Sequence, residues 1–249
     1  MATSSNPARA PTYGHYRKVT RVSGRRLILT LGLWLGVLLV LAVGTLLGSR
    51  WLLAGWEASH VPDLIAILSW EFYGALLAAL LVCFGGFCGL RDVLGFHWTR
   101  GRDVGLGMLV WGFALVLGTV ATGFTSRLLG AAQSNTVPLL KLSFDPLFVG
   151  LMVPVICLVG PAAEELLFRG ALYGWLRGVM PIPVAGAVAA AAFAGAHLTP
   201  PLLPLLFIFG LAAVIVYQRT GSTFNTFVMH ASQNTLAVLG AYLVLSGRG

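Results

Sequence analysis

Residues 146–177 read PLFVGLMVPVICLVGPAAEELLFRGALYGWLR, an apolar run that ends at Arg177. Its only charged residues before that end are Glu164, Glu165 and Arg169. About 20 apolar residues suffice for one helix to cross the hydrocarbon core of a bilayer. Only helices and closed barrels satisfy their backbone polar groups there, and barrel strands are short and alternate in polarity. The run therefore predicts a membrane-embedded helix. Because it is longer than one span and contains Pro154, Gly160 and Pro161, we expect a kink or break near residue 160.

Similar apolar runs occupy most of the remaining chain. The 249 residues are 57% hydrophobic and 10% charged, with a mean hydropathy of +0.87, which excludes an ordinary soluble domain. The sequence therefore predicts an all-α fold, a polytopic transmembrane helix bundle of about seven spans. The other six runs lie at about 27–47, 64–88, 104–124, 183–198, 202–217 and 222–246.

Basic residues are distributed unequally between the two sides of the predicted bundle. They crowd residues 1–26, which we interpret as a cytoplasmic basic tail before a first span that is retained. The excess on the side of this tail predicts a cytoplasmic N-terminus and a C-terminus outside. This asymmetry explains the net charge of +8, and without a basic face interleaved with aromatic residues no nucleic-acid partner is expected. The tail side carries Arg9, Arg17, Lys18, Arg21, Arg25, Arg26, Arg91, Arg100, Arg102, Arg177 and Arg219, and the other side carries Arg50, Arg127, Lys141 and Arg248.

Ionisable side chains within the apolar runs are costly in a bilayer, so each one indicates a function or a specific pairing. Glu165 and Arg169 are four residues apart and thus neighbours on one helix face, whereas Glu164 lies about 100° around the helix from Glu165. We therefore expect Glu165 to neutralise Arg169 and Glu164 to face a cavity. Glu71 is interpreted as an interfacial or interhelical contact outside the site. The ionisable residues of the runs are Glu71, Glu164, Glu165, Arg169, His197 and His230.

Two further polar elements lie in the later runs. FAGAH occupies residues 193–197, and HASQN occupies residues 230–234, where the histidine and the asparagine share one helix face. At 1.5 Å per residue, both histidines, Asn234 and Glu164 lie about 20 Å from the same membrane boundary. A shared depth favours one common site. In the alternative interpretation, these residues only hold helices together.

The elements EELLFR, FAGAH and HASQN resemble the EExxxR, FxxxH and HxxxN motifs of the CPBP family, which includes type II CaaX prenyl endopeptidases and bacterial Abi-type proteins. They occur in the same order, each on its own predicted helix, and the resemblance covers roughly residues 146–246. It implies a catalytic helix bundle at 146–249, after three N-terminal spans within 27–145. The active site would lie among the last four spans.

The resemblance also implies an activity. The chain would be an intramembrane endopeptidase that hydrolyses a peptide bond of a membrane-associated or lipidated substrate with glutamate-activated water. Glu164 would be the general base, and His197 would help to hold the water. His230 and Asn234 would stabilise the oxyanion of the tetrahedral intermediate. The residues that would support the site are Glu165, Arg169 and Phe193.

Three other interpretations are open at this stage. No cofactor is expected for glutamate catalysis, but Glu164, His197 and His230 are an acceptable set of zinc ligands for a metalloprotease. A non-catalytic family member could act as an immunity or scaffold protein. A transporter or channel could use the same groups to relay protons or bind a cation.

Composition indicates the kind of organism that the chain comes from and, through it, the kind of substrate to expect. All basic residues except Lys18 and Lys141 are arginine, and Ala, Gly and Leu are abundant, which is typical of a GC-rich bacterial genome. We therefore expect a bacterial cytoplasmic membrane. Because bacteria generally lack protein prenylation, a peptide or membrane-protein substrate is favoured. The sequence does not indicate an oligomeric state.

Overall fold

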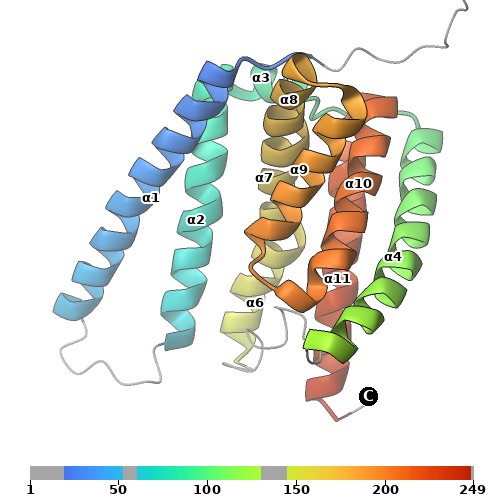
Figure 1. Cartoon of the computed structure of the whole chain (residues 1–249). Coiled ribbons are helices and arrows are strands. Elements are labelled where there is room, and N and C mark those ends of the chain that lie inside the picture. The colour runs from blue at the N-terminus through green and yellow to red at the C-terminus, as the bar shows by residue number, and fades with distance from the viewer. Residues whose placement is uncertain (1–19, 53–60, 130–144, 248–249) are drawn as a thin grey trace, which may run out of the picture.

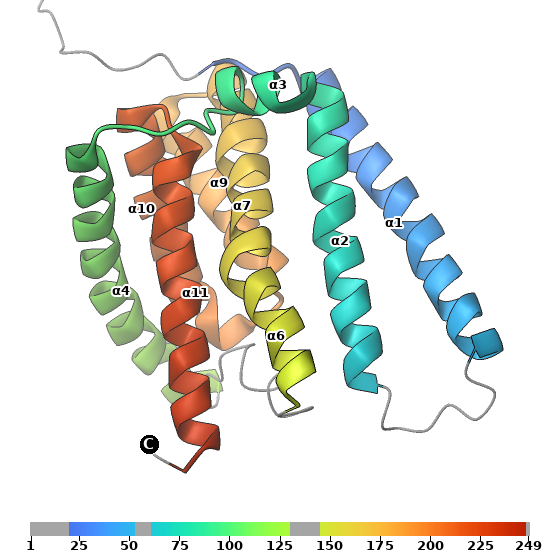
Figure 2. The ribbon, with the colours of Figure 1, turned by 180° about the vertical axis from the view of Figure 1, so that it is seen from behind.

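The structure, a computed structural model, describes residues 20–52, 61–129 and 145–247, without the side chains of 49–52. Every regular element of these residues is a helix (Figure 1). The long helices lie alongside one another, and the first described residues and the C-terminus lie at opposite ends of the bundle in both views (Figures 1 and 2). The predicted all-α bundle is confirmed, and its apolar helices make the chain an integral membrane protein.

The N-terminal part contributes four helices: α1 (Gly24–Leu52), α2 (Val61–Phe84), α3 (Gly86–Asp92) and α4 (Gly101–Leu129). Helix α1 packs against α2 at one side of the bundle, and α4 packs against the C-terminal helices at the other. Many apolar side chains of α1 and α4 are exposed, as expected for helices that face lipid.

The stretch that decides the fold forms one uninterrupted helical path from residue 146 to residue 179. Two of its five segments are π-helical, with hydrogen bonds that reach one residue further than in an α-helix. The segments are α6 (Pro146–Pro154), the π-helix η2 (Val155–Val159), α7 (Gly160–Glu165), the π-helix η3 (Leu166–Tyr173) and α8 (Gly174–Val179).

The irregularity expected near residue 160 is a π-helical turn, and the helix continues through it without a break. The Gly160 N–H donates to the Val155 carbonyl, five residues back. Pro161 has no N–H that could donate to the next carbonyl, that of Ile156. The helix therefore continues past the proline, and the Ile156 carbonyl remains available to a donor from elsewhere.

The last part of the chain contains α9 (Ile182–Ala196), the 3-10 helix η4 (Pro200–Leu202), α10 (Leu203–Thr220) and α11 (Thr223–Leu245). Six helical stretches of the described residues are long and apolar enough to span a membrane. The predicted fifth span at 183–198 differs, because α9 has 15 residues and a length of about 22 Å, short of the roughly 30 Å hydrocarbon core. Helix α9 therefore ends inside the bundle.

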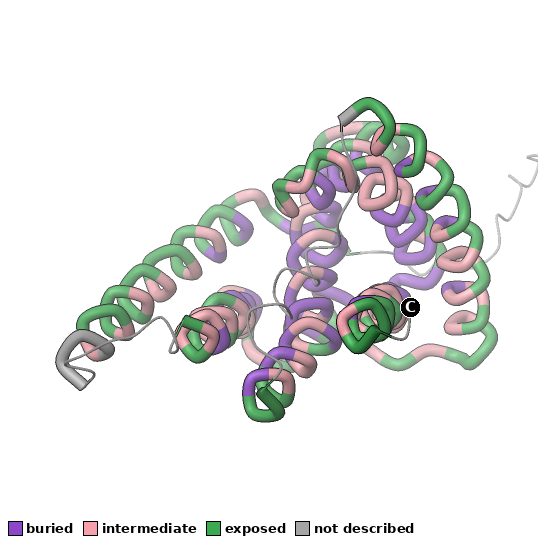
Figure 3. Tube along the Cα trace, turned by 90° about the horizontal axis from the view of Figure 1, so that it is seen from below, coloured by how far each residue is buried: buried purple, intermediate pink, exposed green. Residues whose placement is uncertain are grey.

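Burial concentrates on the helical path from α6 to α8, which lies among the other helices (Figure 3). Ala163, Ala171 and Tyr173 on this path are completely buried. Small residues before the glutamates let neighbouring helices approach closely, as in other membrane bundles. Glu164 and Glu165 thus lie in the interior.

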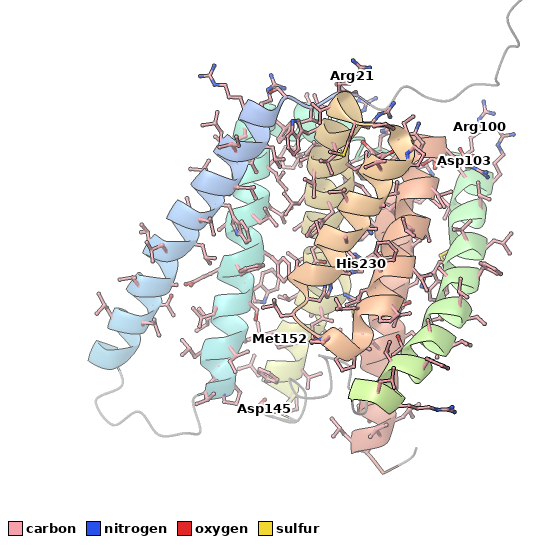
Figure 4. All side chains as sticks on the ribbon, viewed as in Figure 1. Arg21, Arg100, Asp103, Asp145, Met152 and His230 are labelled. Carbon is pink, nitrogen blue, oxygen red and sulfur yellow. The ribbon has the colours of Figure 1, made fainter. Side chains whose placement is uncertain are left out.

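Apart from the glutamates and Arg169 in the interior, several charged side chains lie near the two ends of the bundle. Arg21, Arg100 and Asp103 are at one end, Asp145 is at the other, and His230 lies between them (Figure 4). Arg127 is in the last turn of α4, at the end of that helix opposite Arg102. Some residues counted for the topology lie outside the residues whose side chains are described, namely Arg9, Arg17, Lys18, Arg50, Lys141 and Arg248.

Candidate active site

Glu164 lies on the wall of a cavity of about 510 Å³ within the bundle. Its side chain is 16% exposed, whereas that of Glu165 is completely buried. The two carboxylates diverge because consecutive residues of a helix point in directions about 100° apart. The predicted orientation of Glu164 towards a cavity is therefore confirmed.

Glu165 is the centre of a buried charged group. The Arg169 guanidinium donates to Glu165 Oε1 at 2.7 Å, as the i and i+4 spacing predicts. His230 Nδ1 lies 2.9 Å from the same oxygen. A carboxylate oxygen only accepts hydrogen bonds, so Nδ1 carries the proton of this contact. Helix α11 is thereby joined to α7 at the depth of the site.

Phe193 contacts both the charged group and the histidines. The guanidinium carbon of Arg169 lies 4.3 Å from the centre of the Phe193 ring, which is a cation–π geometry. The same ring meets the imidazoles of His197 and His230, with centroid distances of 4.7 and 5.5 Å. Phe193 thus covers the buried cation with an aromatic face and fixes the position of both imidazoles.

His197 follows the last residue of α9, where the chain leaves the helix. Its Nδ1 lies 2.8 Å from the Phe193 carbonyl oxygen, which can only accept, so Nδ1 is the donor. In a neutral imidazole, Nε2 then has a lone pair. Leu198 follows with φ of +52°, a left-handed conformation that ends the helix and that branched residues rarely adopt. The end of α9 therefore places Nε2 inside the bundle.

Glu164 Oε2 faces both histidines without touching either. It lies 3.9 Å from His197 Nε2 and 3.8 Å from His230 Nε2. Both distances are too long for direct hydrogen bonds and are within reach of one bridging water. Among the described residues, no group hydrogen-bonds to this buried oxygen. The three groups thus form a pocket of acceptors suited to a water molecule.

Asn234 is joined to the π-helical turn. Its Nδ2 donates to the Ile156 carbonyl at 2.8 Å, the carbonyl that Pro161 leaves unpaired. The amide nitrogen has two hydrogens, so one remains for a second acceptor. Asn234 also lines the cavity. A proline in one helix thus orients an amide of another towards the site.

Two residues at the cavity were not identified from the sequence. The Tyr73 hydroxyl of α2 lies 2.7 Å from Glu164 Oε1. Gln233 receives a hydrogen bond from the Trp111 indole of α4 at 2.9 Å. Helical spacing relates only residues of the same helix, so it gave no reason to connect Tyr73 of α2 or Trp111 of α4 with the site.

Glu71 accepts a hydrogen bond from Thr45 of α1, and this confirms its interpretation as an interhelical contact.

Most of the cavity wall is apolar. Apolar side chains from α1, α2, the path from α6 to η3, and the helices after it form this part, with the polar groups gathered around Glu164. Such a lining suits an extended apolar ligand with one polar segment. The apolar wall includes Trp34, Phe72, Leu76, Met152, Leu202, Leu205 and Leu206.

Comparison with known families adds one match. Residues 146–236 match the family described as type II CAAX prenyl endopeptidase Rce1-like. No curated protein and no solved structure matches the chain. The matched segment contains all three motifs and the residues gathered around the cavity, except Ala237 and those of the first four helices.

Proposed function

We propose, because the chain carries an Rce1-like domain of the type II CAAX prenyl endopeptidases at residues 146–236, that it is an intramembrane endopeptidase that uses glutamate-activated water. One observation carries this proposal: Glu164 Oε2 has no hydrogen-bond partner among the described residues and faces two imidazole nitrogens in a cavity. A carboxylate within one water of its target is positioned as a general base.

The attack requires a water held between Glu164 and His197. One hydrogen of the water points to Glu164 Oε2 and the other to the Nε2 lone pair of His197. As the water oxygen bonds to the substrate carbonyl carbon, its proton passes to Glu164, and the carbonyl oxygen becomes an oxyanion. Glu164 then returns the proton to the amine as the carbon–nitrogen bond breaks. The base is thereby restored.

The oxyanion would be stabilised by His230 and Asn234. Because His230 Nδ1 is held by Glu165, its Nε2 can donate only when the ring carries both protons. The second hydrogen of Asn234 Nδ2 supplies another donor. Removing one such donor in other hydrolases costs about 3–4 kcal/mol of transition-state stabilisation. The two donors together would form the oxyanion hole.

Glu165 and Arg169 lower the energetic cost of placing this charged site inside the bilayer. With His230 protonated, the two carboxylates are balanced by one guanidinium and one imidazolium. Because Arg169 is paired with Glu165, the negative charge of Glu164 remains available to act on the water. Isolated charges in hydrocarbon are costly, so a balanced cluster is the form expected in a working site.

The substrate we propose is a peptide segment that is membrane-associated or lipidated. The cavity offers an apolar wall for its hydrophobic part and polar groups for one peptide bond. We further propose a bacterial cytoplasmic membrane, with the N-terminus in the cytoplasm. Arg21, Arg91, Arg100, Arg177 and Arg219 lie in segments at one end of the bundle, which supports this orientation.

The test replaces Glu164 by Gln and compares new protein termini in membranes from cells with the wild-type chain or the variant. We expect termini that depend on wild-type protein to disappear with Glu164→Gln, because the amide cannot take a proton from water. Glu71→Gln is the matched control, since it removes a membrane glutamate on α2 outside the cavity. Identical termini for wild type and Glu164→Gln, with equal expression, would contradict the proposal.

A zinc-dependent reaction with the same residues is a second candidate. Both histidines have Nδ1 held by an acceptor and Nε2 directed at Glu164, which is also how histidine ligands of zinc are oriented. The described residues contain no ready-made group of three or more metal ligands, so Glu164 and the histidines would have to move closer together. Activity lost on prolonged chelation and restored by zinc would favour this candidate.

A further inference from the structure

We propose that Tyr73 is a positioning residue for the general base, contributed by α2 from outside the Rce1-like domain. This inference rests on the proposed role of Glu164. The Tyr73 hydroxyl lies 2.7 Å from Glu164 Oε1, and an ionised carboxylate only accepts, so the phenol donates. Residues 91 positions apart in the chain therefore meet at the reacting group.

The bond to Tyr73 gives the two carboxylate oxygens different tasks. Oε1 is occupied by the phenol, whereas Oε2 faces the histidines without a partner among the described residues. Without Tyr73, the carboxylate could rotate about its last torsion and exchange its two oxygens, because such torsions have broad minima. Tyr73 thus keeps Oε2 directed towards the position between Glu164 and His197 where the mechanism requires a water.

Close packing fixes the phenol itself. A Cβ atom at Gly160 would lie 3.0 Å from Tyr73 Cζ, so a larger residue there would push the ring away by a few tenths of an ångström. The Trp70 indole of α2 donates to the Leu151 carbonyl of α6 at 3.1 Å. Helix α2 therefore already has an anchor on this path, independent of Tyr73. The hydrogen bond from Tyr73 is therefore not needed to hold α2 in place and can serve to orient the Glu164 carboxylate.

The first experiment compares Tyr73→Phe with wild type in cleavage of a fluorogenic peptide that ends in a farnesylated CAAX motif. We expect kcat to fall about 10- to 100-fold with KM within about twofold, as for the loss of one hydrogen bond to a charged group in the transition state. Tyr173→Phe is the matched control. It removes a buried hydroxyl, bonded to Gln218 and remote from the cavity, so its kcat should equal that of wild type.

The second experiment does not depend on proteolysis. The infrared difference between wild type and Glu164→Gln isolates the carboxylate bands of Glu164. We expect these bands to shift in the Tyr73→Phe background, and to keep their position in the Tyr173→Phe background. Unshifted bands would overturn the inference, and so would an unchanged kcat in an enzyme that cleaves the peptide. A chain that produces no cleavage in cells, but shows the shift, would instead overturn the proposed function and keep the hydrogen bond.

Discussion

Two neighbouring glutamates of one helix have opposite surroundings. Glu165 is enclosed with Arg169 and His230, while Glu164 meets the cavity and Tyr73. The pairing of Glu165 with Arg169 and the divergence of Glu164 could both be predicted, because they follow from positions on one helix. The position of His230 near the glutamates was also predicted, from the shared depth and the three motifs. The contact with Tyr73 could not be, since no rule of spacing connects α2 with α7.

The variant Glu165→Gln should destabilise the fold, whereas Glu164→Gln should not. Removing Glu165 leaves the Arg169 guanidinium, 1% exposed, without its counter-charge. The loss of one partner of a buried ion pair costs about 3–5 kcal/mol of unfolding free energy. Thermal unfolding in detergent micelles measures the difference. Equal midpoints for Glu164→Gln and Glu165→Gln would refute the assignment of one glutamate to structure and the other to chemistry.

At the scale of elements, two helices depart from regular spans at the site. Pro154, Gly160 and Pro161 predicted an irregularity near residue 160, and its position was right. Its form was not foreseeable, because a proline can be accommodated by a kink or by a π-helical turn. The short α9 agrees with its apolar run at 183–198, which is itself shorter than a full span, but hydropathy did not show that the helix ends at Ala196, one residue before His197.

The variant Pro161→Ala should reduce turnover without loss of stability. Alanine supplies an N–H that can bond to the Ile156 carbonyl, and this competes with the Asn234 amide. We expect kcat to fall about tenfold through the weakened oxyanion hole. Thermal unfolding should be unchanged or higher, because proline within a helix costs up to about 3 kcal/mol. Pro154→Ala, on the same helical path but off the cavity wall, is the control; equal kcat values for both variants would disprove this coupling.

For the whole molecule, most of the described segments with basic residues lie at one end of the bundle, and Arg127 lies at the other. The all-α bundle could be predicted because hydropathy alone identifies helices in lipid. Their arrangement around the path from α6 to α8 could not, since hydropathy does not say which face of an apolar helix meets lipid and which meets another helix. The sidedness of the bundle stays a prediction.

Reporter fusions test that sidedness. We expect alkaline phosphatase fused after Gly249 to be active, because it folds only outside the cytoplasm, and a cytoplasmic fluorescent protein at the same point to stay dark. Both reporters placed before Met1 should behave in the opposite way. Fluorescence from the C-terminal fusion would mean that the chain crosses the membrane an even number of times or inserts in the reverse orientation.

The contribution of α2 to the cavity wall has a consequence for exchanging parts between relatives. A graft that transfers only residues 146–236 would bring the three motifs into a host whose own second helix supplies the group beside Oε1 and much of the apolar surface. Such a chimera should take the three motifs from one parent, but its turnover and its choice of substrate should depend on both. Exchange of the matched segment alone should therefore succeed best between relatives whose second helices are alike.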